Sequence, residues 1–212
     1  IDEFVGQKHI VGTGKLLRRL IEAQRVPSVI FYGPPGTGKT TLARIIADTS
    51  DSKFVKLNAI SSGVAEVKTV IEQAKKDFEV YGQKTYLLLD ECHRWSKAQS
   101  DSLLAALENG YLIFIGCTTE NPSYSMTRAI VSRCSVFEFK RLGVDDIKSV
   151  LKRAISSDDG LKKYNIKIDD DAMTYIASAC GGDVRSALNG LEIGAITTPE
   201  NENNETVITK EI

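Results

Sequence analysis

The stretch from Gly33 to Thr41 constrains the fold of this chain more than any other. It reads Gly-Pro-Pro-Gly-Thr-Gly-Lys-Thr-Thr, follows the apolar run Val29–Tyr32, and precedes a helical pattern of apolar residues. A glycine-rich loop between a strand and a helix is the setting that a phosphate-binding P-loop needs. Its glycines let the backbone turn and present N–H groups to phosphate oxygens, and the following helix directs its positive end at the same place. The stretch therefore predicts a nucleotide site rather than a chance glycine turn.

Each residue of this loop has a predicted role. We expect Lys39 to reach the β- and γ-phosphates of ATP and the hydroxyl of Thr40 to ligate Mg²⁺. The remaining nucleotide-binding residues expected here are Pro35, Gly36, Thr37, Gly38 and Thr41.

A second signal is the run Thr85–Glu91, which is apolar through three leucines and ends in two carboxylates. A near-continuous apolar run suits a central parallel strand that is buried on both faces. Ligand sites of parallel sheets lie at the carboxyl ends of the strands. We expect Asp90 to hold the Mg²⁺, directly or through water, and Glu91 to orient and polarise the attacking water. A merely solvated strand end is disfavoured because a P-loop lies upstream.

A further buried strand is predicted at Leu112–Cys117, and the polar residues Thr118, Thr119 and Glu120 follow it. A polar side chain at this point can contact the γ-phosphate or the attacking water. Without the P-loop, the β-propensity of threonine would explain the pattern equally well. Which of the two threonines has the role is left open.

The segment that follows Cys92 is interpreted as a surface loop and consists of His93, Arg94 and Trp95. The alternative is a basic and aromatic tip that touches DNA. His93 has no partner at a spacing typical of metal ligands, so no metal is assigned to it.

The predicted fold is α/β: a P-loop parallel sheet with helices on both faces, followed by a small three-helix lid. The expected boundaries are residues 1–142 for the nucleotide-binding domain, 143–197 for the lid, and 198–212 for a linker or the start of a further region. Asp183 is expected to cap the third lid helix. Arg185 lies in its first turn, where a cation is unfavourable, so it is placed for an anion or faces solvent.

Composition narrows the class of protein. The chain has 212 residues and a formal net charge of −1, so nothing global argues for nucleic-acid binding. No apolar run approaches membrane-spanning length. The four cysteines are isolated and are interpreted as reduced thiols. Because the chain begins at Ile1 and stops as a new apolar pattern starts, we expect a fragment of a longer protein.

These motifs together resemble those of the AAA+ ATPases over essentially the whole chain. Gly33–Thr40 resembles Walker A, and Leu87–Glu91 resembles Walker B. The resemblance implies a sensor 1 role for Thr119, an arginine finger at Arg133 within Ser132–Cys134, and a sensor 2 role for Arg185 within Gly182–Arg185. It also implies that Val5, Gly6 and Ile10 belong to a segment that cups adenine.

Within that class, Asp90–Trp95 and Thr118–Tyr124 resemble local signatures of the MgsA/RarA family, which includes the Werner-helicase-interacting ATPase. One departure is Cys92, which stands where an apolar residue is expected. The resemblance implies ATPase action on DNA at stalled replication forks and in recombination, with replication proteins as possible partners. It also implies homo-tetramers formed through a C-terminal helical domain, which we expect to lie outside this stretch of sequence. Such a protein would be cytoplasmic and nucleoid-associated in a bacterium, and nuclear in a eukaryote.

Other functions stay open or are disfavoured. Within AAA+, the alternative is a clamp-loader or Holliday-junction-motor subunit. A different class is a nucleotide-gated interaction module that barely hydrolyses ATP. A P-loop GTPase is disfavoured because no Asn-Lys-x-Asp motif occurs, and a small-molecule kinase because Glu91 stands beside Asp90.

Overall fold

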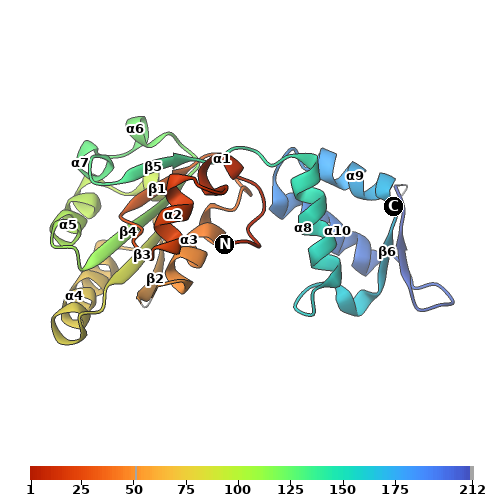
Figure 1. The fold of residues 1–212 in the computed structure, drawn as a ribbon, viewed down its shortest axis with the longest axis horizontal. Coiled ribbons are helices and arrows are strands. Elements are labelled where there is room, and N and C mark those ends of the chain that lie inside the picture. The colour runs from red at the N-terminus through yellow and green to blue at the C-terminus, as the bar shows by residue number, and fades with distance from the viewer. Residues whose placement is uncertain (51, 211–212) are drawn as a thin grey trace. The chain divides into compact units, whose positions relative to one another are not determined.

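A computed structural model describes residues 1–50 and 52–210 of the chain. The chain forms two compact units, coloured mainly red to green and teal to blue in Figure 1. The first comprises Ile1–Asp2, Lys8–Gly33 and Gly38–Phe139, and the second comprises Glu3–Gln7, Pro34–Thr37 and the chain from Lys140 onward. Each unit has its own hydrophobic core.

The first unit is built on a five-stranded sheet with the order β2-β3-β4-β1-β5, and every neighbouring pair is parallel. The strands are β1 (Val29–Tyr32), β2 (Lys53–Asn58), β3 (Thr85–Asp90), β4 (Leu112–Thr118) and β5 (Ser135–Glu138). Because all strands run the same way, their carboxyl ends meet at one edge of the sheet. That edge receives the loop after β1, the acid pair after β3 and the threonines at the end of β4.

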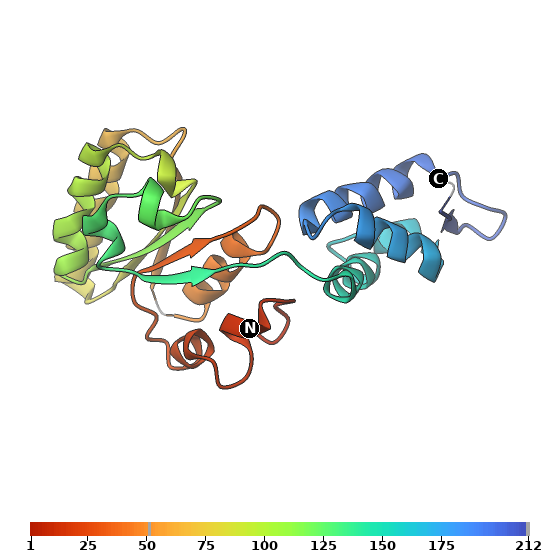
Figure 2. The ribbon, with the colours of Figure 1, turned by 90° about the horizontal axis from the view of Figure 1, so that it is seen from above.

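Helices cover both faces of this sheet, as predicted. The helices of the unit are α1 (Lys8–Val11), α2 (Leu16–Glu22), α3 (Lys39–Asp48), α4 (Val64–Tyr81), α5 (Lys97–Glu108), α6 (Pro122–Ser125) and α7 (Arg128–Val131), with a 3-10 turn at Cys92–Arg94. Figure 2 shows α4 and α5 on one side of the sheet and α3 on the other. Leu87 and Leu89 of β3 pack in one buried cluster with Val67 of α4 and Leu103 of α5. The alternate β3 residue, Leu88, is also fully buried, so β3 is covered on both faces, as its apolar run predicted.

Local end signals in the sequence are confirmed in this unit. Ser96 and Gln99 form a reciprocal capping box at the start of α5. Gly82 ends α4 in the left-handed conformation that favours glycine. Thr13 is a fair N-cap by residue type, but Lys15 rather than Thr13 precedes the first turn of α2.

The second unit contains three helices, α8 (Val144–Ser156), α9 (Asp170–Ala179) and α10 (Val184–Thr197), together with a 3-10 turn at Lys162–Tyr164. The expected purely helical region also holds a small parallel sheet, in which β6 (Ile166–Ile168) pairs with β7 (Thr206–Ile208). Ile208 is buried with Ile166 in the helical core, so residues 206–208, expected in a linker, pack with this unit. The last two residues of the expected linker, 211 and 212, lie outside the described residues.

Candidate functional site

The loop between β1 and α3 has the backbone of a phosphate cradle. Gly33, Gly36 and Gly38 have φ values of 140°, 62° and 94°, a region that L-residues with side chains rarely adopt. A Cβ on Gly33 would lie 2.1 Å from the carbonyl oxygen of Phe139, so only glycine fits there. No side chain in the described part of the chain caps α3 at Gly38. A helix N-terminus without a side-chain cap is a typical place for an anion to bind.

The side chain of Lys39 lies at the base of this loop. It is largely buried, and its Nζ donates a hydrogen bond of 2.7 Å to the carbonyl oxygen of Gly33. Thr40 beside it is half-buried, whereas Thr41 and Pro35 are exposed. An amine at this position can exchange the carbonyl for phosphate oxygens, the chemistry expected of a P-loop lysine.

The tip of the loop, Pro34–Thr37, belongs to the second unit and contacts the start of α10 there. The N–H of Val184 donates to the carbonyl oxygen of Gly36 at 3.0 Å. A Cβ on Gly36 would lie 1.7 Å from Oδ1 of Asp183, so this close approach also requires glycine. Asp183 caps α10 as predicted, accepting from the N–H groups of Arg185 and Ser186.

The remaining residues predicted for the nucleotide lie at several places. Arg185 is exposed, and its side chain makes no hydrogen bond or ion pair within residues 1–50 and 52–210. Val5 and Gly6 belong to the second unit, where a Cβ on Gly6 would lie 2.2 Å from Cδ2 of Leu142. Ile10 lies in α1 of the first unit. The adenine-cupping role of these residues and the sensor role of Arg185 stay predictions.

A structural role that the sequence reasoning missed belongs to Gln7. Its side chain is buried, and its amide pairs with the backbone of Lys140: Nε2 donates to the carbonyl oxygen at 2.7 Å, and Oε1 accepts from the N–H at 2.9 Å. Nε2 also lies 3.4 Å from the carbonyl oxygen of Thr37. The sequence signal for this role was the position of Gln7 directly after Val5-Gly6. A glutamine in a sequence does not by itself show which backbone groups it binds.

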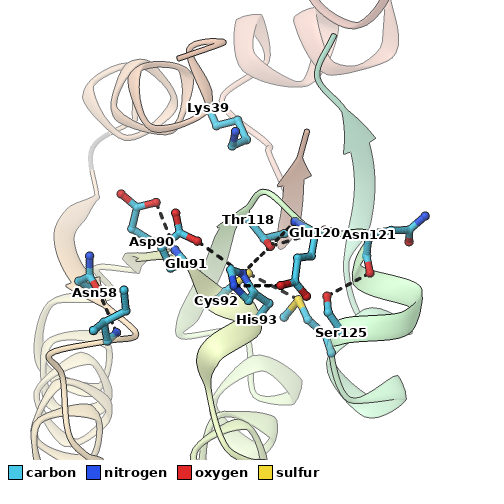
Figure 3. A network of polar contacts seen from close by, with 12 residues as sticks. Lys39, Asn58, Asp90, Glu91, Cys92, His93, Thr118, Glu120, Asn121 and Ser125 are labelled. Atoms are coloured by element: carbon cyan, nitrogen blue, oxygen red, sulfur yellow. Dashed lines mark hydrogen bonds and ion pairs between the residues drawn. The ribbon is translucent and has the colours of Figure 1, made fainter. Parts of the chain in front are cut away.

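The acid pair lies where the sequence predicted it, at the end of β3. Asp90 is the last residue of the strand, and one of its carboxylate oxygens accepts from the N–H of Glu91 at 3.2 Å. Glu91 has a left-handed backbone with φ of 54°, and its side chain is 34% exposed. Figure 3 shows Lys39, Asp90, Glu91 and Thr118 around one region of the first unit. Hard oxygen ligands suit Mg²⁺, so Asp90 and the Thr40 hydroxyl fit its predicted site.

The two threonines after β4 have different surroundings. Thr118 is buried, and its Oγ1 accepts from the N–H of Glu120 at 3.0 Å. Its carbonyl oxygen accepts from the N–H of Gly33 at 3.2 Å, which joins the end of β4 to the start of the P-loop. Thr119, predicted as sensor 1, is exposed. Thr118 is therefore the threonine that takes part in the polar network around the acid pair, while the role of Thr119 stays a prediction.

The surface-loop prediction for the residues after the acid pair is wrong for two of them. The side chain of His93 is only 6% exposed and points into the polar network of Figure 3. Trp95 packs against the hydrophobic core, and only Arg94 is exposed. Glu91 has a left-handed backbone, and the short 3-10 turn that follows it contacts β4. The alternative, a basic and aromatic tip, is likewise not formed.

Cys92 stands where an apolar residue was expected, and it packs in the structure as an apolar residue would. It is buried in the core, and its Sγ lies 3.5 Å from Sδ of Met126. Burial raises the pKa of its thiol well above the usual range. Burial also raises the pKa of Cys117, and raises that of Cys134 to about 12. These three thiols stay protonated and behave as small hydrophobic groups.

Arg133 follows α7 at the surface of the first unit. Its guanidinium is bound by the carboxylate of Glu108, with Nε donating to Oε1 at 3.1 Å, and it also donates to the carbonyl oxygen of Ala129 at 2.8 Å. Arg133 is thus an ion-paired surface residue within one chain, and its arginine-finger role stays a prediction.

No group of three or more His, Cys, Asp or Glu side chains lies close enough to hold a metal ion in residues 1–50 and 52–210. Over the same residues, no helix is long and apolar enough to cross a membrane.

Comparison with protein families decides the class. The family described as "ATPase family associated with various cellular activities (AAA)" matches residues 29–142, and the "AAA C-terminal domain" matches residues 162–212. The chain belongs to the AAA family of ATPases. The P-loop, the acid pair and the sheet described above all fall within the first match.

The sequence relatives of this AAA chain include replication-associated recombination proteins. It is 42% identical over 212 residues to Replication-associated recombination protein A of Bacillus subtilis, a match that covers 100% of this chain and 49% of the relative. The same protein of Escherichia coli K12 is 39% identical over 211 residues, covering 99% and 47%. ATPase WRNIP1 of Dictyostelium discoideum is 38% identical over 202 residues, covering 95% and 23%. The chain spans about half the length of these bacterial relatives.

Solved structures with a similar fold include RuvB of Thermotoga maritima. One RuvB mutant aligns with a TM-score of 0.76 at 23% identity, covering 99% of this chain and 68% of that chain. A second structure, described as a Holliday junction branch migration motor, aligns with a TM-score of 0.73 at 27% identity, covering 91% and 62%. These likenesses confirm the α/β fold with a helical C-terminal unit.

Proposed function

We propose that this protein is a Mg²⁺-dependent ATPase that acts on DNA in replication-fork maintenance and recombination. The observation that carries the proposal is the convergence of Lys39, Asp90, Glu91 and Thr118 beside the glycine cradle at one edge of the sheet. The replication and recombination context is supported by the names of relatives at 39–42% identity.

The proposed chemistry assigns one task to each side chain. Lys39 leaves the carbonyl of Gly33 and neutralises charge on the β- and γ-phosphates. The carboxylate of Glu91 orients a water molecule for in-line attack and accepts its proton. A bound Mg²⁺ would be held by Asp90 and Thr40 and would offset the charge of the phosphate oxygens. A threonine at the end of β4 reports on the γ-phosphate, and Thr118 and Thr119 are the two candidates.

Two elements of the proposal lie beyond one chain. Arg133 is proposed to act on ATP bound by a neighbouring subunit, where an arginine stabilises charge that develops during transfer. The full-length protein is proposed to assemble as a tetramer through a C-terminal domain, with DNA and replication proteins as partners. Its place of action would be the nucleoid in a bacterium or the nucleus in a eukaryote.

The test is the ATPase rate of the full-length protein on forked, blunt-ended and single-stranded DNA. We expect turnover that depends on Mg²⁺, is abolished by chelation, and rises with one of these DNA structures. Glu91→Gln should keep ATP bound but stop hydrolysis, because an amide cannot act as the base. Loss of ATP binding in this variant would instead make Glu91 a structural residue.

A second candidate is a nucleotide-gated interaction module with little turnover. The observation that favours it is the ion pair between Arg133 and Glu108. In this pair, the guanidinium that is proposed to act on a neighbouring subunit is bound by a carboxylate of its own chain. A turnover that stays low on every DNA structure, with tight ATP binding, would favour this candidate. Preferential stimulation by a four-way junction would instead favour a junction motor, the function named for the RuvB structure.

A further inference from the structure

The turn at Cys92–Arg94 follows β3 and contacts β4. Glu91 enters it through a left-handed backbone, and the N–H of Arg94 closes it by donating to the carbonyl oxygen of Glu91 at 2.9 Å. Cys92 anchors it from below in the hydrophobic core. The side chain between these two anchors, His93, is 6% exposed. Its ring is therefore fixed by packing rather than left free in solvent.

The ring of His93 faces three polar groups of the candidate site and bridges two strand ends (Figure 3). Nδ1 lies 2.8 Å from Oγ1 of Thr118 and 3.5 Å from Oε2 of Glu91. Nε2 lies 3.5 Å from Oε1 of Glu120. The hydroxyl of Thr118 can donate to the carbonyl oxygen of Glu120 at 3.5 Å, so Oγ1 can accept from Nδ1–H, the same N–H that faces Oε2 of Glu91.

We propose that His93 is a positioning residue for ATP hydrolysis: it holds the carboxylate of Glu91 and the hydroxyl of Thr118 in a fixed relation to one another. The inference rests on the proposed function, because it takes Glu91 as the base. It adds a residue that acts through Glu91 and Thr118 and does not itself touch ATP. It also identifies Thr118 as the threonine that is coupled to the base.

The physical reason is the freedom of a glutamate side chain. The side chain of Glu91 is one-third exposed, and its Oε2 lies 3.5 Å from Nδ1 of His93. A general base must lie within hydrogen-bond reach of the proton that it takes. A misplacement of about 1 Å in a catalytic group can lower the rate by about 10²-fold. The ring of His93 is buried and hydrogen-bonded to Thr118 of β4, so it can hold the carboxylate of Glu91 in one position.

The test compares substitutions that keep different ring nitrogens. The amide of His93→Asn reaches the position of Nδ1, the amide of His93→Gln reaches that of Nε2, and His93→Leu fills the space with neither. In full-length protein, we expect Leu and Gln to lower kcat by about 10²-fold. Asn should restore most of the loss, because only Nδ1 faces both Glu91 and Thr118. The Kd for ATP should change by less than about twofold in all three, because the ring is placed on the base and not on the nucleotide.

A double-mutant cycle keeps the proposal testable if the Leu variant unfolds. Thr118→Val removes the same hydrogen bond from the other side, so its effect on kcat should not multiply with that of His93→Gln. Arg94→Gln, an exposed neighbour in the same turn, is the control and should keep the wild-type rate. Thermal unfolding of every variant separates misfolding from misplacement.

The outcomes distinguish this inference from the proposed function. An active Glu91→Gln variant would overturn Glu91 as the base, and with it the role of His93. An inactive Glu91→Gln beside a fully active His93→Gln would overturn the positioning role alone. The positioning role would also be overturned if His93→Gln had a kcat as high as that of His93→Asn. It would likewise be overturned if the kcat losses of His93→Gln and Thr118→Val multiplied in the double mutant.

Discussion

Replacing Arg133 with alanine should change the free energy of unfolding and the activation free energy of ATP hydrolysis by very different amounts. In the structure its partner is Glu108, and the two side chains are 36% and 57% exposed. Exposed ion pairs of this kind contribute about 0.2–1 kcal/mol to stability. An arginine that acts across a subunit interface contributes about 10³-fold or more in rate, which corresponds to about 4 kcal/mol in the activation free energy. We therefore expect Arg133→Ala to lower stability slightly and turnover severely.

The assay measures both quantities on the full-length protein and uses a matched control. Glu108→Gln breaks the same ion pair but keeps the guanidinium, so it should lose similar stability in urea unfolding while keeping its turnover. Mixtures of Arg133→Ala and Glu91→Gln subunits add a further readout. They should regain activity only where an intact Arg133 meets an intact Glu91 across an interface.

Two results would refute this reasoning. One is an isolated chain of these 212 residues that is monomeric by light scattering yet turns over at the full-length rate. The other is a loss of turnover in Arg133→Ala no larger than that in Glu108→Gln, which would make Arg133 only a surface ion-pair residue.

Three further predictions concern the nucleotide and the thiols. Lys39→Ala should weaken ATP binding by about tenfold to a hundredfold, since hydrogen bonds to charged groups contribute about 1.5–3 kcal/mol; unchanged affinity in calorimetry would refute the P-loop assignment. Arg185→Ala should weaken nucleotide binding by about tenfold for the same reason, and normal affinity with normal turnover would leave it a surface residue. Because burial raises the pKa of Cys117 and Cys134, both thiols stay protonated at pH 8. Alkylation followed by mass spectrometry should therefore be about a hundredfold or more slower in the native than in the unfolded chain, and rapid native labelling would contradict this.

The parts of the fold that the sequence predicted correctly rest on local signals. The capping box of Ser96 and Gln99 needs only residues three apart, and the buried strand at Thr85–Asp90 is visible in its own apolar run. The pairing of β6 with β7 was not predictable in this way. Each strand has three residues, and about forty residues separate them, so neither segment carries a strand signal of its own.

The candidate site shows the same limit at the level of single side chains. The P-loop and the acid pair are contiguous motifs, so their chemistry could be predicted from residue types and spacing. The direction in which His93 points depends on the left-handed backbone at Glu91, and no sequence pattern marks a glutamate for that conformation. Successive side chains of β4 point to opposite faces of the sheet, so Thr118 and Thr119 point in different directions. An error of one residue in the predicted strand end therefore exchanges the two threonines.

The backbone of Glu91 also has a consequence for how this position can vary. A left-handed conformation costs about 1–2 kcal/mol for a residue with a Cβ, and glycine largely avoids that cost. With φ of 54°, the position would thus make a more stable fold with glycine than with the glutamate it carries. The proposed base stands where stability and activity favour different residues, so random mutagenesis selected only for thermostability should drift away from glutamate here and produce well-folded, inactive proteins.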